Sequence, residues 1–347
     1  MPQYTIPPYR VEQVIKSLSQ AADWSIGQYE IPALWKDATG KGVKVAVLDT
    51  GCQTDHPDLQ GQIKACEDFT NSRWGCEDRN DHGTWVAGMI AAVNNEVGVV
   101  GVAPEAELYI GKVLGDSGSG SSQSVANGID WAREQGCQIV SMSLGSPYSD
   151  STIYNAIKRF VDRRNCFIIA AAGNDGNPAG TDSINYPGKH PETIAVGAVD
   201  NEGRRTYFSS RGPAIDVMGP GQDMLSTVTG SQYASMSGTS MATPFVCGVI
   251  TLALSKGIDF RDYNGLRDKI KMVSDDIGEV GFDPDTGWGL IDPDEVLESG
   301  NDTPDFPDTP NTDNEGITEF EVGNTTISFP VVFNGRAGIH IGTKEGG

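Results

Sequence analysis

The chain has 347 residues, of which 38% are hydrophobic and 43 are glycine, a composition that excludes a disordered chain and fits a loop-rich globular protein with one large domain. Its 25 basic and 47 acidic residues give a net charge of −22, which makes nucleic acid an unfavourable partner. No apolar run approaches the ~20 residues that span a bilayer, and residues 3–14 lack the basic start and apolar run of a secretory signal. We therefore expect a cytoplasmic protein.

The N-terminal residues 3–14, QYTIPPYRVEQV, predict a stiff and extended segment, because no helix would hold the pair Pro7–Pro8. From about residue 40, short apolar runs alternate with helical patterns. This alternation predicts an α/β fold, a doubly wound and mostly parallel sheet with helices on both faces. The predicted strands cover residues 42–50, 107–114, 138–145, 167–173 and 193–200, and the predicted helices cover residues 82–93, 121–136 and 151–165.

The composition changes near residue 300. Residues 301–315 contain three prolines and five acidic residues but no lysine or arginine, which is typical of a linker. The β-rich residues after it are too few to fold alone. We predict a linker over residues 300–316 and a short C-terminal β segment over residues 317–347.

The six cysteines are too few for a disulfide scaffold in a chain of this size. Cys66 and Cys76 flank a polar loop and would pair in an oxidising compartment. In a cytosolic protein we expect all six to be reduced. The other four lie in or beside apolar runs, where a thiol acts as a small core side chain: Cys52, Cys137, Cys166 and Cys247.

Three polar residues are predicted at the C-terminal ends of strands or at the starts of helices, where the active residues of a parallel α/β sheet usually lie. Asp49 ends a strand, His82 begins a helix, and Ser240 lies at the head of an apolar helix with Pro244 in its first turn. Singly, each is an ordinary turn, structural or N-cap residue. Together, in the order Asp, His, Ser, they favour nucleophilic catalysis, since a helix N-terminus stabilises developing negative charge.

The segments DTG, HGT and GTSMATP that hold these residues, with SMSLG and AAAGNDGN between them, resemble the signatures of the subtilisin family of serine peptidases. The resemblance covers roughly residues 23–297. It implies that Ser240 attacks the peptide carbonyl, His82 transfers the proton and Asp49 orients the imidazole. It also implies that Asn174 donates its amide to the oxyanion.

The same resemblance implies a substrate cleft and a calcium loop. One edge of the cleft would be Gly118, Ser119 and Gly120, and the other Ser143, Leu144 and Gly145. Asp175 would lie at the rim of the pocket for the P1 residue, so we expect lysine or arginine to be tolerated there. The segment AAVNNEVGVVGVAP resembles the family's loop for structural Ca²⁺, with oxygen ligands from Gln20, Asp58, Val93, Asn95, Val97 and Val99. The chain departs from the family at Trp85 and Phe245, which replace two usual histidines outside the triad.

The segment YTIPPYRV resembles the short N-terminal extension of intracellular subtilisins, which blocks the cleft. This implies a zymogen in which Ile6, Pro7, Pro8 and Tyr9 cross the active site until the extension is cleaved; an ordinary packed arm is the simpler alternative. We divide the chain into an inhibitory extension (residues 1–22), a peptidase domain (23–299), the linker and the tail.

The expected function is a serine endopeptidase of broad specificity that acts on proteins and peptides, without nucleic acid or membrane partners. Two alternatives stay open: a secreted subtilisin exported by an unrecognised route, and a catalytically silent binding module of the same fold. The sequence also leaves open whether the chain forms a homodimer.

Overall fold

The computed structural model describes residues 2–16, 20–176, 180–298, 317–322 and 325–330. The chain divides into two units, residues 1–300 and 301–347, each described by itself. In the second unit, β13 (Ile317–Val322) and β14 (Thr325–Pro330) pair as antiparallel strands. The predicted linker at residues 300–316 and the last seventeen residues of the tail lie outside the described residues.

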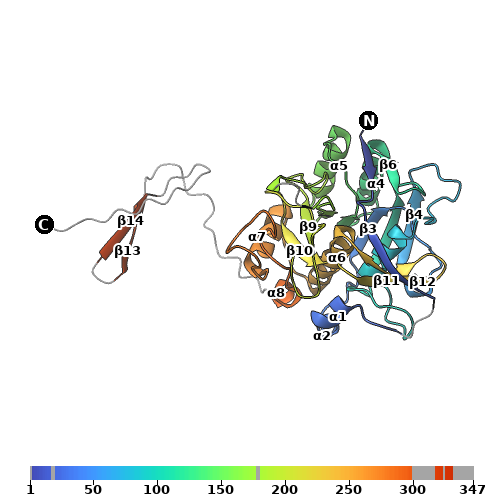
Figure 1. Cartoon of the computed structure of the whole chain (residues 1–347), viewed down its shortest axis with the longest axis horizontal. Helices are drawn as coiled ribbons and strands as arrows, with labels where there is room; N and C mark the ends of the chain where they lie inside the picture. Colours follow the sequence, from blue (N-terminus) through green and yellow to red (C-terminus); the bar gives the residue numbers. More distant parts are fainter. Residues whose placement is uncertain (1, 17–19, 177–179, 299–316, 323–324, 331–347) are drawn as a thin grey trace. The chain divides into compact units, whose positions relative to one another are not determined.

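The first unit is built on a seven-stranded sheet in which every neighbouring pair is parallel, so the predicted fold class is confirmed (Figure 1). Its strand order is β10-β9-β8-β7-β3-β5-β4. The strands are β3 (Lys44–Asp49), β4 (Ile63–Asp68), β5 (Glu107–Lys112), β7 (Ile139–Met142), β8 (Phe167–Ala171), β9 (Ile194–Val199) and β10 (Val217–Pro220).

Helices cover both faces of this sheet because successive side chains of each strand point to opposite sides. Val45 and Val47 of β3 join the core that contains α3 (His82–Ala91) and α6 (Thr239–Lys256). The alternate residues Ala46 and Leu48 join the core that contains α4 (Ser122–Glu134) and α5 (Ser151–Val161). The described unit also contains α1 (Trp24–Gln28), α2 (Ile31–Leu34), the short 3₁₀ helix η1 (Pro57–Leu59), α7 (Tyr263–Val273) and α8 (Pro293–Glu298).

The long helix α6 runs through the middle of the unit. By length and composition it is apolar enough to cross a membrane, but 83% of it is buried inside the fold. A helix that is hydrophobic on all sides is typical of the core of a large domain. Its buried first turn holds Ser240, so the core itself fixes the position of this serine.

The N-terminal extension contributes a strand to each of two small sheets that the sequence did not predict. β1 (Gln3–Thr5) pairs antiparallel with β6 (Ser119–Ser121). β2 (Arg10–Ile15) pairs antiparallel with β12 (Gln232–Ser237), which in turn pairs with β11 (Met224–Val228). The extension is therefore ordered on the surface of the first unit over residues 3–15.

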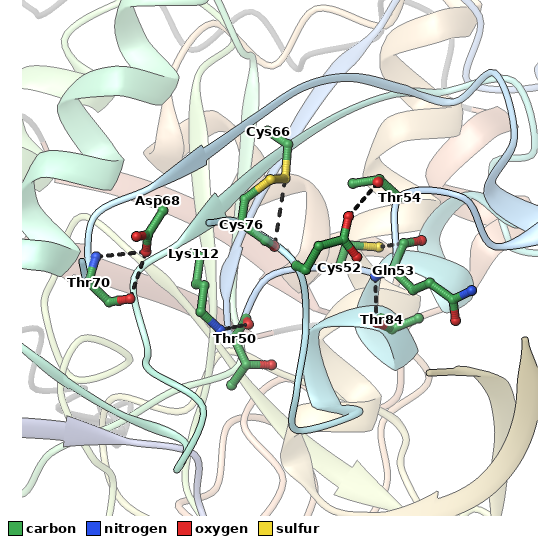
Figure 2. Close-up of a disulfide and its surroundings, with 11 residues drawn as sticks. Thr50, Cys52, Gln53, Thr54, Cys66, Asp68, Thr70, Cys76, Thr84 and Lys112 are labelled. Carbon is green, nitrogen blue, oxygen red and sulfur yellow. Dashed lines mark hydrogen bonds between the residues drawn. A yellow bond between two sulfur atoms is a disulfide. The ribbon is translucent and has the colours of Figure 1, made fainter. Parts of the chain in front are cut away.

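Cys66 and Cys76 form a disulfide, so the expectation that all six cysteines are reduced is wrong for this pair (Figure 2). Cys66 lies in the edge strand β4, and Cys76 lies in the loop that leads to α3. The other four cysteines are free and buried, as predicted. The spacing of the pair in sequence could not decide its redox state, because that state depends on which groups the fold brings together.

Removing this disulfide is expected to lower the free energy of unfolding by about 2–4 kcal/mol, because the crosslink restricts the unfolded chain. The test is urea unfolding of wild type and of the Cys66→Ser/Cys76→Ser variant, both inactivated by Ser240→Ala to prevent self-digestion. Dithiothreitol should destabilise only the parent. Equal midpoints for the two chains, with and without the reductant, would show that the bond contributes nothing to stability.

Candidate active site

Asp49 and His82 meet at the carboxyl edge of the central sheet. Asp49 is the last residue of β3 and His82 the first of α3, and both side chains are buried. The distance from His82 Nδ1 to Asp49 Oδ1 is 2.8 Å, and the same oxygen accepts the backbone N–H of Thr50 at 2.7 Å. A carboxylate can only accept here, so Nδ1 carries the proton and Nε2 is left as the acceptor nitrogen. Nε2 is buried and makes no hydrogen bond to the described residues.

Ser240 occupies the second position of α6, within the first turn, where backbone N–H groups have no carbonyl partner inside the helix. Its Oγ donates a hydrogen bond to the carbonyl of Ser143 at 3.4 Å. Because His82 Nε2 has no hydrogen-bond partner in the part of the chain that the structure describes, the serine–histidine hydrogen bond of an active triad is not made in this structure. Such bonds often tighten only when substrate binds.

Asn174 follows β8, and its amide is oriented by the residue before Ser240. Its Oδ1 accepts the backbone N–H of Thr239 at 2.9 Å and the Thr239 hydroxyl at 2.8 Å. With the oxygen fixed in this way, Nδ2 must point the other way, as a donor. The neighbouring Gly238 leaves room for this amide, since a Cβ there would lie 3.1 Å from Asn174 Nδ2. Thr239 is a contributor that the sequence reasoning missed, because a threonine beside a serine carries no signal of its own.

The two predicted cleft edges lie on either side of the N-terminal extension. Tyr4 pairs with Gly120 in the β1–β6 ladder, and Ile6 donates its N–H to the carbonyl of Gly118 at 3.0 Å. On the other side, Thr5 donates to the carbonyl of Gly145 at 3.0 Å and accepts the Gly145 N–H at 2.8 Å. The predicted edge residues Ser119, Ser143 and Leu144 lie in the same two segments, and Ser119 pairs with Thr5.

Beyond Ile6 the extension reaches residues that the sequence predicted to be catalytic. The carbonyl of Pro8 accepts a hydrogen bond from Asn174 Nδ2 at 2.7 Å. The Tyr9 ring centroid lies 5.1 Å from that of His82, and Tyr9 Cβ would lie 3.5 Å from a Cβ at Gly238. Burial, with the nearby charges of acidic groups, raises the pKa of Tyr9 to about 12.

A pocket of about 440 Å³ lies beside Pro7 and Pro8. Asp175 lies on its wall, where its carboxylate accepts the amide of Asn185 at 2.6 Å. A second acidic residue of the wall, Asp182, is already paired with Lys189. Of these two carboxylates, Asp175 is bonded to an amide, whereas Asp182 is bonded to a cation.

The six predicted calcium ligands also lie together. The Asp58 carboxylate accepts hydrogen bonds from the N–H of Val99 at 2.8 Å and the amide of Asn95 at 3.3 Å. Gln20 Nε2 donates to the carbonyl of Val93 at 3.2 Å, and Asn95 Oδ1 accepts the N–H of Val97 at 3.1 Å. No group of three His, Cys, Asp or Glu that suits a metal occurs within the described residues. The cluster contains one carboxylate, that of Asp58, which contacts N–H groups of Asn95 and Val99.

The two departures from the family pattern are core residues. Trp85 is fully buried and donates its indole N–H to the carbonyl of Ala234 at 2.9 Å. Phe245 is also fully buried and packs on Tyr29, with ring centroids 5.5 Å apart. Neither substitution disturbs the Asp49–His82 contact, because each large side chain is accommodated in the apolar core.

Comparisons with known proteins show the family to which the chain belongs. M-protease from Shouchella clausii (strain KSM-K16) is 42% identical over 83% of this chain and 73% of its own. Subtilisin Savinase from Lederbergia lenta is 43% identical over 79% of this chain and 97% of its own. An intracellular serine protease from Paenibacillus polymyxa is 46% identical over 71% of this chain and 77% of its own. The model of the subtilase family matches residues 40–289. The chain therefore belongs to the subtilase family and is a serine endopeptidase.

Proposed function

We propose that this endopeptidase cleaves peptide bonds through an acyl-enzyme formed on Ser240. His82 takes the serine proton at Nε2 and returns it to the leaving amine, and Asp49 holds the Nδ1–H tautomer and stabilises the imidazolium. The observation that carries this assignment is the 2.8 Å contact between Asp49 and His82, both buried. Asn174 Nδ2 would stabilise the oxyanion together with the backbone N–H of Ser240.

The two cleft edges support recognition of an extended peptide as an added strand. Their contacts with residues 4–6 of the extension are hydrogen bonds between backbone groups. Such bonds give affinity without reading the identity of alternate side chains. This favours broad specificity toward proteins and peptides, with selection confined to the side-chain pockets.

We further propose that the extension is an inhibitor that is removed to activate the enzyme. Residues 4–6 dock as a substrate strand would, and Pro8 and Tyr9 then cover Asn174 and His82. Pro7 has no N–H to donate to the cleft edge. Asn174 Nδ2, the proposed oxyanion donor, donates a hydrogen bond to the carbonyl of Pro8. These contacts at the catalytic residues favour a lock over an arm that merely packs on the surface.

Asp175 is expected to make lysine or arginine tolerated at P1. Replacing it with lysine reverses the charge on the pocket wall, and should lower kcat/KM for substrates with Lys or Arg at P1 more than for those with Leu. The measurement is a comparison of otherwise identical chromogenic peptides, with Ser151→Ala, an exposed change on α5, as the control. An unchanged P1 profile would remove Asp175 from this role.

The oxygen donors around Asp58 fit a structural Ca²⁺, which would neutralise the carboxylate and tie residue 20 to the loop at residues 93–99. Calcium at a hundred times its Kd should stabilise the fold by about 2.7 kcal/mol. Thermal melting of the Ser240→Ala chain, in calcium and in EGTA, measures this shift. The Asp58→Asn variant should melt at one temperature in both buffers, and a parent that does so would contradict the site.

Two observations bear on the compartment. The resemblance of the extension to intracellular subtilisins favours the cytoplasm, as does the similarity to the intracellular serine protease. The Cys66–Cys76 disulfide favours an oxidising compartment, and so supports the alternative of a secreted enzyme. Alkylation of thiols at the moment of cell lysis, followed by intact-mass measurement, distinguishes four alkylated cysteines from six.

The assignment of Ser240 is tested by labelling with a serine-directed fluorophosphonate and mapping the modified peptide. We expect a single label on Ser240 after the extension is removed, and none in His82→Ala. A label elsewhere, or equal labelling without His82, would contradict the proposed triad.

A further inference from the structure

A buried carboxylate outside the triad connects the two elements that carry Asp49 and His82. Asp78 lies in the loop before α3, with only 3% of its surface exposed. One carboxylate oxygen accepts the hydroxyl of Thr50 at 2.9 Å and the N–H of Asn80 at 2.8 Å. The other accepts both the hydroxyl and the N–H of Thr84, at 2.7 and 2.9 Å. Desolvation raises the pKa of Asp78, and these hydrogen bonds oppose that rise.

The partners of Asp78 are neighbours of the catalytic pair. Thr50 directly follows Asp49, and its hydroxyl also accepts the N–H of Gly83, the residue after His82, at 3.0 Å. Thr84 lies in the first turn of α3, two residues after His82. The Asp78 carboxylate thus joins the end of β3 to the start of α3, next to the 2.8 Å contact between Asp49 and His82.

The loop that contains Asp78 is also held by backbone hydrogen bonds and by the disulfide. Asp78 donates its N–H to the carbonyl of Cys52 at 3.3 Å, and Cys52 donates to the carbonyl of Cys76 at 3.1 Å. The disulfide to Cys66 anchors Cys76 to β4, and Lys112 donates to the carbonyl of Thr50 (Figure 2). Asp78 is therefore held by groups that do not belong to the triad.

We infer that Asp78 is a positioning residue for the reaction: by joining Thr50 to Thr84 it holds Asp49 and His82 in register, and it adds a buried negative charge to the neighbourhood of the imidazole that becomes cationic. This inference rests on the proposed triad and adds a second carboxylate to it, which acts through Thr50 and Thr84 and not on substrate. A misplacement of catalytic groups by about 1 Å can cost about 10²-fold in rate. A buried carboxylate is costly unless its hydrogen bonds are made. Losing the hydrogen bonds of Asp78 should therefore disturb both Thr50 and Thr84.

The test compares Asp78→Asn with Asp55→Asn, which removes the same charge from an exposed site in the neighbouring loop. Each full-length chain is activated by a trace of affinity-tagged wild type, which is then captured and removed. We expect Asp78→Asn to lower kcat by about 10- to 100-fold with KM within twofold, and to move the acid limb of the kcat/KM profile to lower pH. The limb shifts down because the imidazolium loses a stabilising negative charge. Asp55→Asn should match wild type in all three readouts.

Thr84→Ser and Thr84→Val keep the test decisive if Asp78→Asn does not fold. Serine retains the hydroxyl that binds Asp78 and should keep kcat, whereas valine should lower it and shift the acid limb. Circular dichroism and fluorophosphonate titration establish that each chain is folded and count its active sites. Folded variants with unchanged kcat and pH profile would overturn the positioning role alone. Wild type that hydrolyses nothing after activation would overturn the proposed triad, and this inference with it.

Discussion

Replacing Ser240 with alanine is expected to lower kcat by about 10⁶-fold, a magnitude taken from the corresponding change in subtilisin itself, a member of the same family. The change deletes the proposed nucleophile, whose Oγ donates to the carbonyl of Ser143. The nearby hydroxyls of Thr239 and Thr243 are already bonded, to Asn174 and to the carbonyl of Thr239. The residual rate should still exceed that of the uncatalysed reaction, because Asn174 and the cleft edges remain. Single-turnover and steady-state assays on a chromogenic peptide measure both quantities.

Ser151→Ala serves as the matched control, since Ser151 is exposed on α5. It should retain the wild-type kcat. Circular dichroism should show that the Ser240→Ala chain is folded, because the missing hydroxyl makes a single 3.4 Å hydrogen bond. If the folded variant kept more than about a hundredth of the wild-type kcat, Ser240 would not be the nucleophile.

Loosening the extension should produce the second large effect, a rise of about 10²- to 10³-fold in the initial activity of the full-length chain. Tyr4 is fully buried in the core beside β6, and truncation of a buried aromatic side chain to alanine costs about 3–5 kcal/mol. The substitution destabilises the docked extension relative to the undocked one, because Tyr4 is buried only when the extension is docked. Tyr4→Ala should therefore open the cleft before any cleavage takes place.

Val14→Ala is the control for this experiment, because Val14 belongs to the same extension but is 54% exposed on β2. Its initial activity should equal that of wild type. Initial rates must be recorded while intact mass still shows the full-length chain. If wild type and Tyr4→Ala start at the same rate, the extension is a packed arm and not a lock.

The central sheet could be predicted because its strands are apolar on both faces, and that pattern is local. Residues 45–48 and 167–172 are continuous apolar runs, and they form most of β3 and all of β8. β1 and β2 were missed because short strands are defined by their partners, and those partners lie over a hundred residues away. The polar Gln3 and Thr5 at the ends of β1 carry no apolar pattern, and only pairing with Ser119–Ser121 makes them a strand.

The candidate site divides in the same way. Asp49, His82 and Ser240 could be predicted because each stands at a strand end or helix start, in segments that resemble a family. The orientation of Asn174 could not, since it depends on Thr239, and neither could Asp78, whose role rests on contacts with Thr50 and Thr84. An aspartate in a polar loop looks like a solvated charge until the fold buries it.

The most direct test of a self-locked endopeptidase is one time course on purified wild type and Ser240→Ala, in calcium. Intact mass and hydrolysis of casein are followed together. We predict that wild type loses about its first twenty residues as activity rises, the span predicted for the extension, while Ser240→Ala stays whole and inactive. Full activity before any loss of mass would contradict the lock. An absence of casein hydrolysis, even after the extension is removed, would contradict the proposed active site.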